Sequence, residues 1–113
     1  MLVLSRKLNE AVVLGDEVVV RVTRIDAEEV DIVIERLGSE GHATVILPRS
    51  RSYPESEPDE THSIQLSGGE CCPVVCVDIC PGKVRLGFGV SRYSSIYRHE
   101  LYDAIVQARN SNG

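Results

Sequence analysis

Hydrophobic and polar residues alternate in short runs along most of this chain, which is the period of a β-strand rather than of a helix. In the first third of the sequence these runs cover residues 2–7, 10–14, 17–25 and 30–37. Gly15 and Asp16 are a turn signal between two β-branched runs. The second and third runs are therefore predicted to form a β-hairpin.

The middle of the chain has a different texture, because it is rich in Pro, Ser and Glu. Residues 43–47 (ATVIL) predict a strand, and residues 49–62 predict an exposed acidic loop. Strand character resumes at residues 72–80, and a turn at Pro81-Gly82 leads to a further strand at residues 83–91. Gly87 and Gly89 within that strand indicate a bulge or a close approach of another segment.

The period changes once more near the C-terminus, within the segment SIYRHELYDAIVQA at residues 95–108. SIYR predicts a short last strand. In the part that follows, apolar residues recur at helical spacing, at Leu101, Ala104, Ile105 and Ala108. One C-terminal helix is therefore predicted. Residues 17–34 and 72–88 share a strand–turn–strand rhythm, which leaves a partial internal duplication open.

Length and charge narrow the class of protein. With 113 residues, of which 42% are apolar, one domain with a modest core is expected. The net charge is −5, but it is uneven: residues 18–83 carry −6 and residues 84–113 carry +2. No apolar run approaches the roughly 20 residues of a membrane span. Charges at Arg6, Lys7 and Glu10 interrupt any signal-peptide core, so a cytoplasmic protein is expected.

Candidate chemistry is sparse. The cysteines are Cys71, Cys72, Cys76 and Cys80, and the last three lie at even spacing within a predicted strand, where residues four apart are separated by roughly 13 Å. They are therefore predicted to be buried, reduced side chains and not metal ligands. No nucleophile, phosphate-loop or metalloprotease motif occurs, so neither an enzyme nor a cofactor is predicted.

The basic residues form a pattern. Arg6 and Lys7 close the first strand, whereas Arg92 precedes the last strand and Arg98 ends it. If the first and last strands pair, these cations gather at one edge of a sheet. An arginine fork suits phosphate or the edge of a guanine base.

Residues 1–23, beginning MLVLSRKLNEAVVLGDE, and residues 84–108, VRLGFGVSRYSSIYRHELYDAIVQA, resemble the two ends of the carbon storage regulator family (CsrA/RsmA). In one register, residues 26–82 are an insertion between the third and fourth strands of a single domain spanning 1–113. In another register, residues 17–37 supply strands three and four, and the extra material follows them. The better match of VRLGFGVS favours the first register.

The resemblance implies a mainly β fold: a small antiparallel sheet or barrel formed by an intertwined homodimer, with one C-terminal helix per chain. It implies two equivalent RNA sites that bind GGA-containing hairpin loops of mRNA leaders, so that translation is repressed or mRNA stability altered. The implied partners are mRNA, small regulatory RNA and, in some bacteria, a flagellar assembly protein that acts as an antagonist. No membrane association is implied.

The positions of this sequence that match the family's RNA contacts lie in the first and last strands and in the loop between the last two. They are Leu4, Ser5, Arg6, Lys7, Arg92, Ile96, Tyr97 and Arg98. The sequence departs from the family pattern at Asn9-Glu10, Val90-Ser91, Ser94 and Tyr97. Ser94 and the acidic loop favour a rival interpretation, a protein-interaction module of the same fold that has lost RNA binding. The retained Leu4, Arg6 and Arg98 oppose it.

Overall fold

The computed structural model describes residues 1–53, 55, 57–89 and 96–98, and these residues form nine strands and two short 3-10 helices. The strands are β1 (Leu2–Lys7), β2 (Ala11–Leu14), β3 (Val18–Ile25), β4 (Glu29–Arg36), β5 (His42–Pro48), β6 (Thr61–Gln65), β7 (Cys71–Cys80), β8 (Lys83–Phe88) and β9 (Ile96–Arg98). The 3-10 helices are η1 (Pro58–Glu60) and η2 (Ser67–Gly69).

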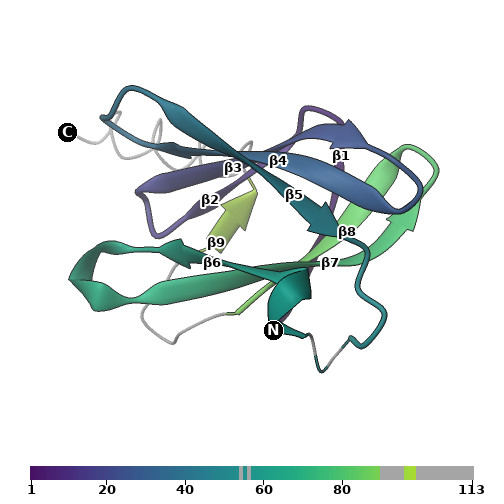
Figure 1. The fold of residues 1–113 in the computed structure, drawn as a ribbon. Helices are drawn as coiled ribbons and strands as arrows, with labels where there is room; N and C mark the ends of the chain where they lie inside the picture. Colours follow the sequence, from purple (N-terminus) through teal and green to yellow (C-terminus); the bar gives the residue numbers. More distant parts are fainter. Residues whose placement is uncertain (54, 56, 90–95, 99–113) are drawn as a thin grey trace.

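The strands form two antiparallel sheets that lie one above the other (Figure 1). Sheet A has the order β1-β8-β7-β6, and sheet B has the order β5-β4-β3-β2-β9. The chain crosses between the sheets after β1, after β5 and after β8, so each sheet contains strands from both ends of the sequence. The mainly β fold class is confirmed for the described residues.

The core lies between the two sheets and consists mostly of aliphatic side chains from alternate positions of the strands. Phe88, Leu14 and Ile32 are among its largest members, and each is at most 1% exposed. The strand β2 is buried on both faces, because Ala11 and Val13 form a second small cluster with Val19. Burial of these apolar side chains supplies the main driving force for folding.

The predicted hairpin of β2 and β3 is confirmed, and its turn has the chemistry that its geometry requires. Gly15 and Asp16 both have positive φ, at 58° and 57°. This is the left-handed pair of a type I′ turn, whose twist matches that of the flanking strands. The four strands predicted in the first third of the chain are all present.

The close approach predicted at Gly87 and Gly89 is confirmed, although β8 ends at Phe88 and Gly89 follows it. A Cβ atom at Gly89 would lie 2.5 Å from Cγ of Pro73, and one at Gly87 would lie 3.1 Å from Cγ1 of Val75. Gly89 N also donates a hydrogen bond to Pro73 O. These two glycines therefore let β7 and the segment after β8 come into contact.

The acidic loop predicted at residues 49–62 is only partly correct. It contains η1, and β6 begins within it at Thr61, a strand that the sequence pattern did not indicate. Glu60 is 9% exposed, and its carboxylate accepts hydrogen bonds from the hydroxyls of Ser50 and Ser52 and from the amide of Arg51. Some of the polar groups in this segment therefore form hydrogen bonds with the carboxylate of Glu60 instead of facing solvent.

The short last strand is present as β9, but its partner is β2 and not the first strand. The predicted helix at residues 99–108 lies outside the described residues. Among the described residues, no helix is long and apolar enough to cross a membrane.

Candidate nucleic-acid interface

Strand β1 forms one edge of sheet A and pairs with β8 along its inner side. Its side chains alternate between the two faces of the sheet, so Ser5 and Lys7 are exposed on the outer face while Leu4 and Arg6 turn inward. The outer edge of β1 therefore offers backbone groups, a hydroxyl and an ammonium group together.

Two residues of β8 extend this exposed surface and were missed by the sequence analysis. Lys83 lies opposite Lys7 in the ladder, and Arg85 lies opposite Ser5, and both are exposed. We call Lys7, Lys83 and Arg85 the basic patch. Within the described part of the chain, none of the three belongs to an ion pair. The alternation of polar and apolar residues in KVRLGF indicates that Lys83 and Arg85 share one face of the strand. Pairing with β1 is what brings them next to Lys7.

Arg6 is in a different environment, because it points toward the interior and is 5% exposed. Its Nε atom donates to Ser5 O at 2.7 Å, and its Nη1 atom donates to Ala11 O at 3.2 Å. The carboxylate of Glu10 lies 4.0 Å from Nε. Arg6 therefore ties β1 to the start of β2 in this structure, and its guanidinium group is not on the exposed surface.

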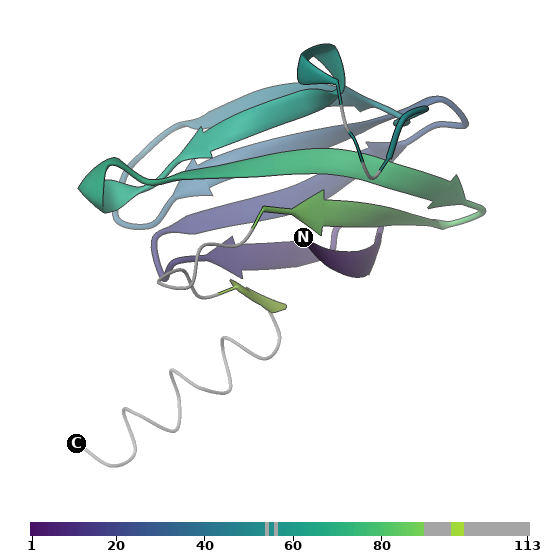
Figure 2. The same cartoon turned by 90° about the horizontal axis from the view of Figure 1, so that it is seen from below.

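The contact between Arg6 and Ala11 links the two halves of the predicted site. Val12, the next residue of β2, is the register partner of Arg98 in β9. The first and last strands therefore do not pair. The guanidinium group of Arg6 nevertheless binds Ala11, the neighbour of the residue in β2 that pairs with Arg98. Figure 2 shows β1, next to the N-terminus, on the same side of the molecule as β9.

The remaining predicted contacts divide between these strands and residues that the structure does not describe. Ile96 and Tyr97 pair with Leu14 and Val13 in the β9–β2 ladder. Leu4 is half-buried and packs against the core. Arg92 lies outside the described residues.

The corner between β1 and β2 holds the end of β1 in place. Glu10 accepts a hydrogen bond from the amide of Lys7 at 2.7 Å, and its own amide donates to Lys7 O at 3.0 Å. Asn9 has a positive φ of 69°, and its carbonyl accepts from Nη1 of Arg21. The backbone of Lys7 is therefore fixed, while its side chain remains exposed.

The cysteines are not arranged as a metal site. Cys72 and Cys76 are core residues, Cys71 is exposed and Cys80 is intermediate, and all four are free thiols. Burial raises the pKa of the thiols of Cys72 and Cys76 to about 11. A search of the described residues found no group of three potential ligands that could hold a metal ion.

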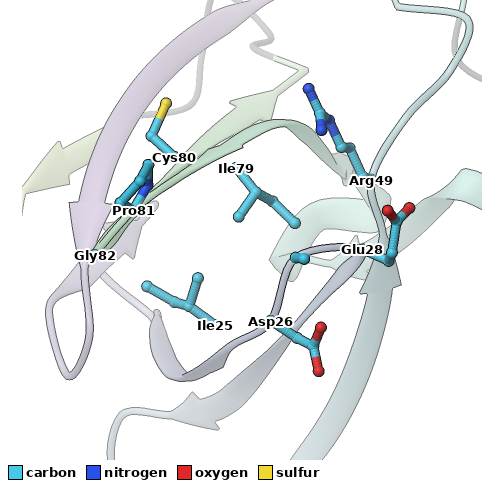
Figure 3. A pocket seen from close by; sticks show the side chains of 9 residues that line it. Ile25, Asp26, Glu28, Arg49, Ile79, Cys80, Pro81 and Gly82 are labelled. Atoms are coloured by element: carbon cyan, nitrogen blue, oxygen red, sulfur yellow. The ribbon is translucent and has the colours of Figure 1, made fainter.

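A surface hollow of about 400 Å³ lies between the turn that follows β3 and the turn that follows β7, next to Lys83 in the sequence (Figure 3). Ile25 and Ile79 contribute apolar lining, and Arg49 and Glu28 lie at one side. Its lining includes one thiol, Cys80, and the carboxylate that accepts from it, Asp78, is already paired with Arg49 at 2.8 Å. We therefore regard the exposed edge formed by β1 and the basic patch as the better candidate site.

Comparison with known proteins gave one family match. Residues 1–36 match the model of the CsrA family, described as a global regulator protein family. The match covers β1 to β4, about a third of the chain. The family is regulatory and RNA-binding rather than enzymatic. No solved structure matched the chain.

The extent of the match bears on the two registers considered for the resemblance. It continues through residue 36 and so includes residues that the first register placed in an insertion. In this stretch it follows the second register, in which β3 and β4 are the family's third and fourth strands.

Proposed function

We propose that this protein is a post-transcriptional regulator that binds GGA-containing hairpin loops of mRNA leaders and thereby represses translation or alters mRNA stability. The observation that carries the proposal is the basic patch beside the edge of β1, because β1 and Lys7 lie within the residues that match the CsrA family and pairing with β8 adds Lys83 and Arg85. A chain of net charge −5 that gathers three exposed cations at one sheet edge, none of them in an ion pair with another described residue, has a local surface suited to phosphate.

The proposed contacts divide by chemistry. The basic patch meets phosphates of the loop, and the open backbone of β1 and β9 forms hydrogen bonds with base edges. Single-stranded loops are suited to such a surface, because their unstacked bases expose hydrogen-bonding edges. Tyr97 is proposed to stack on a base, and Arg98 is proposed to contact the RNA where β9 ends.

The test is a titration of the full chain with a GGA-hairpin RNA and with the same hairpin whose loop GGA is replaced by CCU. Tight binding of the first RNA and weak binding of the second is expected, and Arg98→Ala should lower the affinity for the GGA loop by at least tenfold. Arg51→Ala, which removes an exposed cation of the loop after β5, is the matched control and should leave the affinity unchanged. Equal affinity for both RNAs would remove the proposed specificity.

The burial of Arg6 favours a second candidate function, a protein-interaction module with the same fold. An arginine whose donors are engaged by backbone carbonyls is not presented to an RNA. In that case the chain binds neither RNA at low salt, and Lys83→Ala has no RNA affinity to change. The same titration therefore separates the two functions.

A further inference from the structure

The two sheets are built by equivalent halves of the chain. Sheet A has the order β1-β8-β7-β6, and four neighbouring strands of sheet B have the order β5-β4-β3-β2. The first half comprises β1 to β4, and the second half comprises β5 to β8. Each set of four strands contains the first strand of one half, followed by the last three strands of the other half in reverse order. Two such sets are related as the two subunits of a strand-exchanged dimer are related, but here they belong to one chain.

The registers show that this equivalence holds residue by residue. In the pair β3·β4 the register shifts by one residue between Val22 and Arg24. In the pair β7·β8 it shifts between Cys76 and Asp78, which lie 54 positions further along the chain. The ladder partners of Val22 and Cys76 are Ile32 and Leu86, which are also 54 positions apart. A bulge at the same place in both hairpins is a specific structural feature and not a general property of antiparallel pairs.

The first strands of the two halves match in the same way. Arg6 pairs with Val84, and Leu47 pairs with Val30, the residue equivalent to Val84. Arg6 and Leu47 therefore occupy the same position, and both are buried. The three-residue corner between β1 and β2 corresponds to the longer loop between β5 and β6, which contains η1.

The hollow of Figure 3 fits the same symmetry. Its lining comes from the turn at residues 25–28 and from the turn at residues 79–82, again 54 positions apart. Ile25 and Ile79 are equivalent residues in the two hairpins. Equivalent turns meet where the axis that relates two halves passes between them.

The two equivalent outer faces carry opposite charge. Lys83 and Arg85 of sheet A correspond to Glu29 and Asp31 of sheet B, while Lys7 and Ser5 correspond to Pro48 and Ile46. Glu29 and Asp31 are already paired with Arg24, whose Nη2 atom lies 2.8 Å and 2.9 Å from their oxygens. Among the described residues, the outer face of sheet A presents three exposed cations without an ion pair, whereas on sheet B Arg21, which also has no ion pair, is half-buried and donates to Asn9 O.

The sheets also differ at their far edges. In sheet B, β9 pairs with β2, whereas in sheet A the equivalent strand β6 is the edge of the described sheet. The proposed RNA site needs a first strand and a last strand. The described part of the chain contains one such pair, in which β1 comes from the first half and β9 follows the second half. The equivalent combination would need a strand beside β6, and the described residues contain none.

We infer that this chain is a strand-exchanged pseudo-dimer folded from two unequal halves, and that it acts as a monomer with a single RNA site, on the face of β1 and β8. The inference rests on the proposed function for the identity of the ligand. It replaces the homodimer with two equivalent sites that the resemblance implies. One molecule binds one hairpin loop and does not bridge two loops of the same RNA.

The experiment measures the mass of the full chain by native mass spectrometry and light scattering, alone and with two RNAs. One RNA carries a single GGA hairpin, and the other carries two GGA hairpins joined by a flexible linker. A mass of 12.4 kDa, one single-hairpin RNA per chain, and two chains on the two-hairpin RNA without a gain in affinity are expected. A stable dimer, two single-hairpin RNAs per chain, or markedly tighter binding of the two-hairpin RNA would overturn the inference.

Matched substitutions at equivalent positions locate the site. Lys83→Ala should weaken RNA binding several-fold, whereas Glu29→Ala, the equivalent change on sheet B, should not weaken it. Equal losses for both variants would contradict a single site. If wild type binds no GGA RNA at any salt concentration, the proposed function and the single RNA site both fail. A mass of 12.4 kDa would then still support the internal pseudo-dimer, and a dimer would overturn it.

Discussion

At the scale of single residues, the candidate site depends on which face of a strand each side chain occupies. Arg6 and Lys7 are neighbours in the sequence, but Arg6 is buried against Ala11 O and Lys7 is exposed beside Lys83. The two cations consequently have different roles. Arg6 holds the corner between β1 and β2, and Lys7 is available to a ligand.

Lys7→Ala should therefore reduce affinity for the GGA hairpin without loss of stability. Loss of one charge-assisted contact of about 1.5 kcal/mol corresponds to about tenfold in affinity. Arg6→Ala, in contrast, should lower the thermal midpoint of unfolding, because it leaves the carbonyls of Ser5 and Ala11 without their side-chain donor. Fluorescence anisotropy with thermal melts of each variant measures both effects, and a Lys7 variant that binds like wild type would exclude this residue from the site.

The cysteines provide a second residue-scale prediction. Cys72 and Cys76 are buried, and the pKa of each thiol is raised to about 11, so little thiolate forms at pH 8. Iodoacetamide at pH 8 should modify Cys71 rapidly, and Cys72 and Cys76 only when urea unfolds the chain. Peptide mass spectrometry follows the time course at each position, and modification of Cys76 in the native protein at the rate of Cys71 would disprove its burial.

At the scale of elements, contacts between strands depend on small features at their ends. Gly89 lies against the ring of Pro73, and a methyl group there has no space because the ring cannot rotate away. Gly89→Ala should therefore destabilise the protein by about 1–3 kcal/mol. Urea unfolding measures the change, with Ser63→Ala, an exposed position on β6, as the control. A Gly89 variant as stable as the control would show that the segment after β8 can move away from β7.

The segment between β5 and β6 depends on one carboxylate. Hydrogen bonds from Ser52, and then from the amide of Arg51, lower the pKa of Glu60 below its ordinary value. A lowered pKa in the folded state means that this stabilisation is present above the ordinary carboxyl pKa and is lost as the pH falls through the lowered value. Glu60→Gln should therefore lower the urea midpoint at pH 7, and the difference from wild type should shrink as the pH falls through the acid range.

Exposed Glu55→Gln is the control for this prediction, and its urea midpoint should follow that of wild type at every pH. A difference between wild type and Glu60→Gln that stayed constant from pH 7 into the acid range would mean that the carboxylate of Glu60 does not titrate in the folded chain as described.

At the scale of the whole molecule, a local basic patch operates within a net charge of −5. Contacts between cations and phosphates release counterions, so RNA binding should weaken as salt is added. We expect three such contacts to a single-stranded loop. A plot of the logarithm of the association constant against the logarithm of the salt concentration should then have a slope of about −2. Lys83→Ala should reduce the magnitude of this slope by about one phosphate contact. Salt titrations of both proteins measure the slopes, and identical slopes would place the RNA elsewhere.

Most of the strands and both hairpin turns were predictable, because alternation, β-branched residues and Gly-Asp or Pro-Gly pairs act locally. Strand β6 was not, because THSIQ has one core residue, Ile64, and pairing with β7 decides its conformation. Of the candidate site, the contribution of β1 followed from its sequence. Lys83 and Arg85 did not, because a register that joins residue 7 to residue 83 is a long-range choice.

The sequence by itself determined the β character of the chain, the two predicted hairpin turns and the basic residues at the end of the first strand. It also predicted the burial of Cys72 and Cys76, but Cys71 is exposed and Cys80 is only partly buried. The tertiary structure decided which strands are neighbours. It buried Arg6, gathered the basic patch and placed its acidic counterpart on the opposite sheet. Alternation specifies which side chains share a face of a strand, whereas the pairing of distant strands depends on how both sheets close over one core.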